Sequence, residues 1–527
     1  MLLSLPPETI EKVVAFVASQ EIVGGPPPGL FALMLTCRYM HYLLSPEHNP
    51  GRFYRLFHDR FDLAAPQRRA HCLPSNPVMF STEARQRFAS LKLIRARRFN
   101  HPEMLRSLLV AYVMISEDDG TNGMHLRWAG LREFLQTYLM RGDPGPDLND
   151  VWSLAAILQT QWSFSDSLRS ESEDERDTML SLLDPHLFGQ LHNKPVLHHG
   201  SCSSSSSSPC MSEASSRKLA ISQFGHSIDV NTPAIAPYAI LSFVLRVERY
   251  KLANPQNVPS ARSERLGFGP TKEDFDQYNA ACQTHAVSDS SPIQSTSSQN
   301  DVDWARLIYM NATLPSGTTV RPFRIGALAG SWDGTLLLPS LHPVQSDSDP
   351  PRGLGPVEYL SRQPIALELH EHYSYSPLSP NVCCKQAFEA EYVGPPVLCE
   401  CALNLHGQCL ENDARLSSRD TSCPASVYTC DCIHELNESA VTDISVTGVT
   451  PPDFGAAWGA YRFKGRVRIS DGLIVLRRDP IGSSAASPAW LFGYVLGSRQ
   501  LVGRWHVGSP GTETPWEGVF GLWKSVT

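Results

Sequence analysis

This sequence has no excess of basic charge and no long apolar run. Its 45 Lys and Arg residues are outnumbered by 53 Asp and Glu, which gives a formal net charge of -8 over 527 residues. Without a basic excess, nucleic acid and anionic membrane surfaces are excluded as main partners. The nearest approach to an apolar run, residues 234–245, contains Pro237 and ends before Arg246. It therefore predicts a buried helix and no membrane span.

A secretory signal is also lacking at the start of the sequence. The first residues carry no basic region, and Pro6, Pro7 and Glu8 stand where a signal would be apolar. We therefore expect a cytoplasmic or nuclear protein.

Motifs for bond chemistry are lacking as well. The sequence contains no Gly-rich phosphate loop, no G-x-S-x-G elbow and no H-E-x-x-H pair. Each of these would supply a nucleophile, a metal or a phosphate cradle. The sequence thus predicts a protein that is not an enzyme and that has no cofactor.

Cysteine is present in an odd number, thirteen, which does not suit a disulfide framework in a chain without a signal peptide. Eight of the thirteen lie between Cys383 and Cys432. Four of these are weak candidates for zinc ligands, namely Cys399, Cys401, Cys430 and Cys432. Because the spacing is Cys-x-Cys and not the Cys-x2-Cys of structural zinc sites, free loop thiols are the preferred interpretation and zinc is the alternative.

The length exceeds what one core supports and predicts roughly three domains with linkers. Helical periodicity dominates the first half, and short alternating strands dominate the end. We therefore predict an α+β multidomain protein that ends in an antiparallel β-barrel. The expected parts are a helical module (1–62), a helix-rich middle region (80–255) interrupted by a disordered Ser-rich segment (about 199–217), a linker (284–301), and a β domain (302–527) with a Cys-rich insertion (about 376–436).

The clearest strand signal lies at residues 461–469, where apolar residues alternate with Arg and Lys at the period of a half-buried strand. Asp471-Gly472 follows and predicts a two-residue hairpin turn, because both residues tolerate positive φ. In that register Ile469 faces Ile474, and Val467 faces Leu476. Further strands are predicted at 330–338, 365–373, 490–496, 501–505 and 516–523.

Two amphipathic helices are predicted near the N-terminus. Apolar residues recur at helical spacing in 10–17 and, after a Gly/Pro-rich stretch, in 30–44. Two short helices cannot make a self-sufficient core, because chains below about 40 residues usually need a partner or a staple. We therefore expect an apolar surface to be left for another protein.

The segments LPPETIEKVVAFV and LFALMLTCRYMHYLL, with their Leu-Pro opening and Thr-Cys-Arg step, resemble the F-box. The resemblance implies a substrate receptor of a cullin-RING (SCF-type) ubiquitin ligase, which binds a Skp-type adaptor through the apolar helix faces. Carried over to this sequence, the implied adaptor-binding residues are Leu5, Pro6, Ile10, Val13, Val14, Leu30, Leu33, Cys37 and Leu43.

The C-terminal pieces LAGSWDGTLLLPS and GRWHVGSPGTETPWEGVFGLWK resemble the strand-rich domain of a group of fungal F-box proteins, and Gly330-Ser331-Trp332 is similar to the Gly-x-Trp opening of calycin-like barrels. The resemblance implies that this domain captures a substrate protein or peptide. Alternatively, the barrel binds a small molecule that gates recruitment through the F-box. The candidate substrate-binding residues are Trp332, Arg504, Trp505, Trp516 and Glu517.

Overall fold

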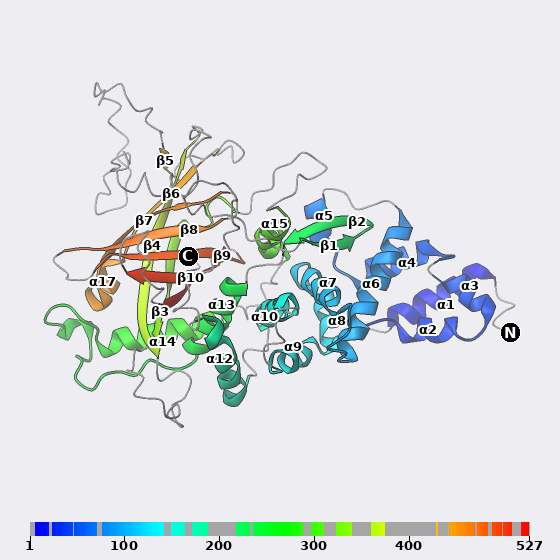
Figure 1. The fold of residues 1–527 in the computed structure, drawn as a ribbon, viewed down its shortest axis with the longest axis horizontal. Helices are drawn as coiled ribbons and strands as arrows, with labels where there is room; N and C mark the ends of the chain where they lie inside the picture. The colour runs from blue at the N-terminus through cyan, green and yellow to red at the C-terminus, as the bar shows by residue number, and fades with distance from the viewer. Residues whose placement is uncertain are drawn as a thin grey trace, which may run out of the picture. The chain divides into compact units, whose positions relative to one another are not determined.

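The computed structural model places two compact units, each built from several stretches of the chain (Figure 1). Unit 1 comprises Met1–His186, Arg217–Val247 and Gln283–Val320. Unit 2 comprises Leu187–Ser216, Glu248–Cys282 and Arg321–Thr527. The structure describes residues 6–20, 24–45, 47–70, 76–141, 149–163, 171–187, 218–231, 235–287, 297–309, 323–339, 360–374, 428–430, 441, 443–469, 472–482, 487–497, 499–507 and 518–525.

Unit 1 is mostly helical, as the sequence predicts. None of its helices, nor any other described helix, is long and apolar enough to cross a membrane. Its helices are α1 (Pro7–Gln20), α2 (Pro28–Met34), α3 (Arg38–Leu44), α4 (Pro50–Arg60), α5 (Ala64–Ala70), α6 (Pro77–Arg95), α7 (Met104–Ser116), α8 (Thr121–Ala129), α9 (Leu131–Leu139), α10 (Asn149–Ser163), α12 (Glu173–Leu187), α13 (Ile235–Glu248) and α15 (Asp301–Tyr309), with a short 3-10 helix η5 (Ser297–Asn300).

The predicted second helix, residues 30–44, is in fact two helices. α2 ends at Met34 and α3 begins at Arg38, because Cys37 adopts an extended conformation and its Sγ accepts a bond from the Met40 N–H at 3.5 Å. Cys37 therefore caps α3 and does not lie within a helix. The apolar spacing continues across the break, so periodicity alone does not reveal it.

A β-hairpin inside unit 1 was not predicted from the sequence. It joins β1 (Lys218–Gln223) to β2 (His226–Asn231), and Phe224 and Gly225 at its tip both have positive φ. Phe224 is buried and its ring packs against Phe57 and Phe80. The hairpin thus contributes to the helical core through its turn.

Unit 2 contains a closed antiparallel β-barrel of eight strands among the described residues (Figure 1). The ladder runs in chain order, and pairing of the first strand with the last closes it, which removes the exposed edges of an open sheet. The strands are β3 (Gly330–Pro339), β4 (Leu360–Ser374), β6 (Asp443–Val449), β7 (Tyr461–Val467), β8 (Ile474–Pro480), β9 (Ala489–Leu496), β10 (Gln500–Val507) and β11 (Gly518–Lys524), and a short β5 (Tyr428–Cys430) adds to β4.

Strand alternation fills the barrel interior with apolar side chains. On β7, Phe463 and Val467 belong to the buried core cluster, whereas Arg462 is exposed. Trp332, Phe520 and Trp505 are among the largest side chains in this interior. A barrel of eight strands has an interior wide enough for such side chains or for one small ligand. The predicted alternation at 461–467 is confirmed.

The predicted β7–β8 register is wrong by two residues. Val467 faces Ile474, and Leu476 faces Gly465. The Arg468 N–H donates to the Leu473 carbonyl at 2.8 Å, so the hairpin closes between these two residues, and Asp471 of the predicted two-residue turn lies outside the described residues. Gly472 does have the positive φ that was expected, 76°.

The boundary predicted near residue 302 also differs from the structure. α14 (Lys272–Val287) begins in unit 2, whereas η5 and α15 belong to unit 1. Within unit 2, the Tyr278 hydroxyl of α14 lies 2.6 Å from Thr335 Oγ1 on the outer face of β3, and Thr335 donates to Glu248 at 2.6 Å. Unit 2 thus includes chain that precedes the predicted linker.

Candidate functional site

Exposed apolar side chains are concentrated on α1, on α3 and at the C-terminal end of α2. Five of the eleven exposed large hydrophobic residues in the described part of the chain occur there. We call them the α1–α3 apolar surface: Val13 (38% exposed), Phe16 (61%), Leu35 (82%), Tyr39 (45%) and Tyr42 (60%). Solvation of so much apolar area on three short helices is unfavourable, and such concentrations mark sites of protein contact.

The predicted adaptor-binding residues divide into buried and accessible groups. Ile10, Val14 and Leu30 are at most 2% exposed, so they hold the helices together and present no side chain to a partner. Val13 and Pro6 are exposed, and Leu33, Cys37 and Leu43 are partly exposed. Leu5 lies outside the described residues. Sequence reasoning missed Phe16, Leu35, Tyr39 and Tyr42, because helical periodicity identifies the apolar face of a helix and not which of its members remain uncovered.

The chain between α1 and α2 is attached to the rest of unit 1 through His125 of α8. His125 Nδ1 accepts the Gly25 N–H at 2.7 Å, and Nε2 lies 2.7 Å from the Arg60 carbonyl oxygen. Burial lowers the pKa of His125 to about 4. A Cβ on Gly25, which has a φ of 90°, would lie 2.4 Å from the Trp128 ring. The Gly/Pro-rich stretch therefore fits closely against α8.

One end of the barrel is covered by the segment that precedes β3. Phe323 and Leu328 of this segment belong to the barrel core cluster. The inward carboxylate of Glu371 on β4 accepts the N–H groups of Gly326 (2.9 Å), Leu328 (2.6 Å) and Ala329 (3.2 Å). Burial raises the pKa of Glu371, and these backbone donors oppose the rise.

Lys524 of β11 holds the same segment from the other side. Its Nζ donates to the carbonyls of Gly326 (3.1 Å) and Ala327 (2.9 Å) and lies 5.7 Å from the Trp332 ring centroid. Trp332 itself is 1% exposed and donates through Nε1 to the Leu328 carbonyl at 2.7 Å. Its role here is to close the barrel end.

Two inward donors lie towards the opposite end of the barrel. Arg478 shares the inward face of β8 with Ile474 and Leu476 and faces Phe463 across the ladder. Trp505 projects inward from β10. Within the described residues, neither Arg478 Nε nor Trp505 Nε1 has a hydrogen-bond acceptor, although both residues are buried. Burial lowers the pKa of Arg478. An unpaired buried donor is unfavourable.

The predicted substrate-binding residues do not converge on one surface. Trp332 and Trp505 are buried in the barrel interior. Arg504 precedes Trp505 on β10 and therefore points outward, where burial lowers its pKa. Trp516 and Glu517 lie outside the described residues. The sequence predicted which segments form strands of the barrel, but not whether each tryptophan side chain points into the barrel or out of it.

The candidate zinc ligands gain no support from geometry. Cys399, Cys401 and Cys432 lie outside the described residues, as does most of the predicted Cys-rich insertion. Cys430 ends β5, and the placement of its side chain is not described. The predicted disordered segment at 199–217 also falls outside the described residues.

Comparison of the chain with protein-family models, with curated proteins and with solved structures finds no match.

Proposed function

We propose that this chain is a substrate-receptor subunit of a cullin-RING ubiquitin ligase, and that it binds a Skp-type adaptor through the α1–α3 apolar surface. The observation that carries the proposal is the concentration of exposed Phe, Tyr, Leu and Val side chains on these three helices. A surface of this kind suits the burial of apolar area against another protein. The F-box resemblance of the same residues supports the choice of adaptor.

The buried residues of the three helices support the same proposal. Ile10, Val14 and Leu30 fix the helices against one another, so the exposed side chains are held in place before binding. A preorganised surface loses little conformational entropy on association. The receptor role requires no bond chemistry from this chain, because holding a substrate near the ubiquitin-charged subunit raises the effective concentration of its lysines.

The adaptor proposal is tested by replacing Leu35 or Phe16 with Asp and measuring binding to a purified Skp-type adaptor by calorimetry. Placing a charge in a desolvated interface is expected to cost at least about 2 kcal/mol, or roughly thirty-fold in Kd. The matched control is Val78→Asp, because Val78 is 50% exposed on α6 of the same unit. This control should bind within about twofold of the unaltered chain.

Circular dichroism separates loss of binding from loss of folding, since all three substituted side chains are largely exposed. The adaptor proposal is wrong if the unaltered chain does not bind the adaptor, or if Val78→Asp weakens binding as much as Leu35→Asp does.

A second candidate function is binding of an anionic small molecule by the barrel, with adaptor recruitment gated by that ligand. The observation in its favour is the pair of inward donors, Arg478 Nε and Trp505 Nε1, that lack acceptors among the described residues. A carboxylate or sulfonate would satisfy both the charge of Arg478 and its free N–H.

The fluorescent anion 1-anilinonaphthalene-8-sulfonate tests the second candidate. We expect Arg478→Gln to weaken its binding at least tenfold, whereas Arg477→Gln on the outer face, where Arg477 pairs with Asp479 at 2.7 Å, leaves binding unchanged. The uncharged analogue N-phenyl-1-naphthylamine should not distinguish the two variants. Equal binding of the sulfonate by both variants would remove the barrel as its site.

A further inference from the structure

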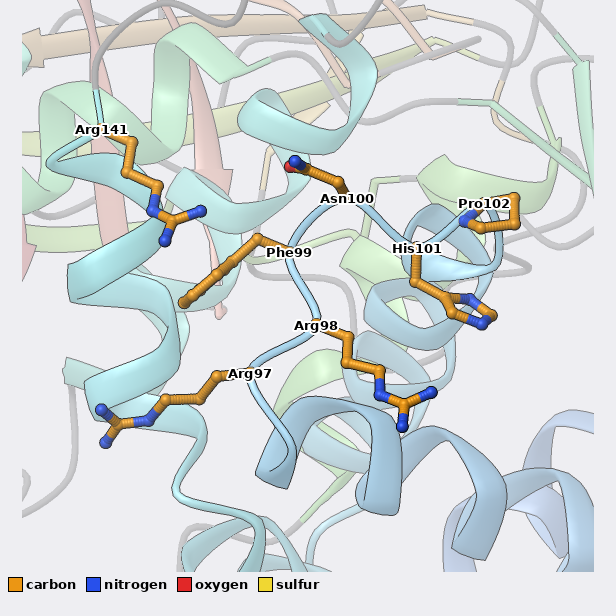
Figure 2. Close-up of a pocket in the computed structure, with 7 residues that line it drawn as sticks. All are labelled: Arg97, Arg98, Phe99, Asn100, His101, Pro102 and Arg141. Carbon is orange, nitrogen blue, oxygen red and sulfur yellow. The ribbon is translucent and has the colours of Figure 1, made fainter.

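A basic hollow of about 460 Å³ lies on unit 1, between the end of α6 and the end of α9 (Figure 2). Three arginines, Arg97, Arg98 and Arg141, line it, and they are all exposed. The remaining lining residues are Phe99, Asn100, His101 and Pro102. The hollow therefore carries three positive charges and no acidic lining residue. Within the described part of the chain, none of the three arginines lies in an ion pair.

Arg141 is held in place by an aromatic ring. Its guanidinium carbon lies 3.9 Å from the centroid of Phe99, and Phe99 in turn stacks on Phe134 of α9 with 4.9 Å between ring centroids. In Figure 2 the Phe99 ring lies between the side chains of Arg97 and Arg141. A guanidinium stacked on a ring keeps its five N–H donors at its edge, where they are available to a ligand.

The backbone of the loop contributes to the same geometry. Arg97 has a φ of 51°, a conformation that costs a residue other than glycine free energy. Hydrogen bonds stabilise it, because the Arg97 N–H donates to the Ile94 carbonyl (2.9 Å) and the Phe99 N–H donates to the Arg97 carbonyl (3.0 Å). The tight turn between these two bonds lets Arg97 and Phe99 project to the same side of the loop (Figure 2).

His101 adds a fourth donor to the hollow. Its Nδ1 accepts the Glu103 N–H at 3.2 Å, which leaves Nε2 to carry the ring proton. In Figure 2 the Arg98 and His101 side chains lie on the same side of the loop, away from Arg97 and Arg141. The loop therefore presents hydrogen-bond donors on two sides, with Arg97 and Arg141 on one and Arg98 and His101 on the other.

Favourable interaction with helix dipoles explains only part of this arrangement. Cations near the C-terminal end of a helix are stabilising, and α6 already has Lys92 and Arg95 in its last turn. Arg97 and Arg98 lie beyond the cap residue Ala96, where the dipole effect fades. If these arginines only stabilised the helix ends, neither the hollow nor the stacking of Arg141 on Phe99 would be needed.

We propose that this hollow binds a phosphorylated side chain on a segment of another protein. A phosphate monoester carries nearly two negative charges at neutral pH and matches the fork of a guanidinium. Arg97 and Arg141, which lie on the Phe99 side of the loop, suit one such group, whereas nucleic-acid sites neutralise many phosphates and the chain has a net charge of -8. Enclosed small-molecule sites are mostly apolar, but here only Phe99 and Pro102 are apolar. The proposal does not depend on the adaptor, because binding is measured on this chain alone.

The test uses fluorescein-labelled pools of nine-residue peptides with a central phosphoserine, phosphothreonine or phosphotyrosine, and the same pools without phosphate. Fluorescence polarisation with the full chain is expected to show at least about tenfold tighter binding of one or more phosphorylated pools. The double variant Arg97→Gln/Arg141→Gln should lose at least about tenfold of that affinity, because it removes two of the three fixed charges. The matched control is Arg106→Gln, since Arg106 lies nearby but pairs with Glu103 at 3.8 Å outside the hollow.

A second variant, Arg97→Gln/Arg98→Gln, leaves the Arg141–Phe99 contact intact and keeps the test valid if the first variant unfolds. It should also lose at least about tenfold in affinity while its melting temperature changes little. The proposal is overturned if the unaltered chain binds phosphorylated and unphosphorylated pools equally. It is overturned as well if the variants have a lower melting temperature but bind the phosphorylated pool as tightly as the unaltered chain. The arginines would then stabilise the helices and have no part in binding.

Discussion

Replacing Arg87 with Met is expected to lower the free energy of unfolding of unit 1 by about 3 to 5 kcal/mol, because it leaves two buried carboxylates without their counter-charge. Arg87 is fully buried and donates to Glu83 (2.9 Å) and Glu117 (2.7 Å). Burial raises the pKa of Glu117, and the charge of Arg87 opposes the rise. Urea unfolding followed by circular dichroism at 222 nm measures the change, since most described helices belong to unit 1.

Arg85→Met is the matched control for Arg87 because it lies on the same helix and also forms an ion pair, with Glu47. Its side chain is 48% exposed, so the loss should stay below about 1 kcal/mol. Adding Glu83→Gln and Glu117→Gln to Arg87→Met should recover part of the stability, because the uncompensated charges disappear. Equal losses for Arg85→Met and Arg87→Met would contradict the assignment of Arg87 as the centre of this network.

Replacing Glu371 with Met is expected to destabilise the barrel by at least about 3 kcal/mol, because three backbone N–H groups and the Tyr373 hydroxyl lose their acceptor. The segment that covers the barrel end should then detach. Trypsin cleavage after the exposed Arg324 reports that detachment directly, and its rate should rise at least tenfold.

Glu368→Met is the control for Glu371, since Glu368 lies on the same strand but is exposed on the outer face. Its tryptic cleavage rate should match that of the unaltered chain. If Glu371→Met were cleaved no faster than Glu368→Met, the carboxylate would not be what holds the covering segment.

The antiparallel barrel could be predicted from the sequence because alternation on β7 and the turn residues around it are visible in short windows. The register could not. A shift of two residues keeps Val467, Ile474 and Leu476 on the same inner face, so the apolar pattern fits both pairings equally well. Local turn chemistry favoured Asp471-Gly472, whereas in the folded barrel the hairpin closes between Arg468 and Leu473.

The candidate sites were less accessible to sequence reasoning because they combine residues that are distant in the chain. Glu371 accepts N–H groups from residues more than 40 positions earlier, and no local pattern marks it. The basic hollow combines the loop at 97–102 with Arg141. In the sequence alone, each of its arginines has the pattern of an ordinary solvated side chain. At the N-terminus the helices were predicted, but which apolar residues remain uncovered depends on how α2, α3 and α8 pack.

Barrel closure by β3 and β11 also constrains the order of events during synthesis. β11 is made roughly 180 residues after β3, and at about 5 to 20 residues per second this interval lasts on the order of 10 to 40 seconds. Throughout it, one edge of β3 has no partner and offers its backbone groups to any other strand. The nascent chain therefore passes through a period in which the barrel cannot close and this edge of β3 is open to pairing with another strand.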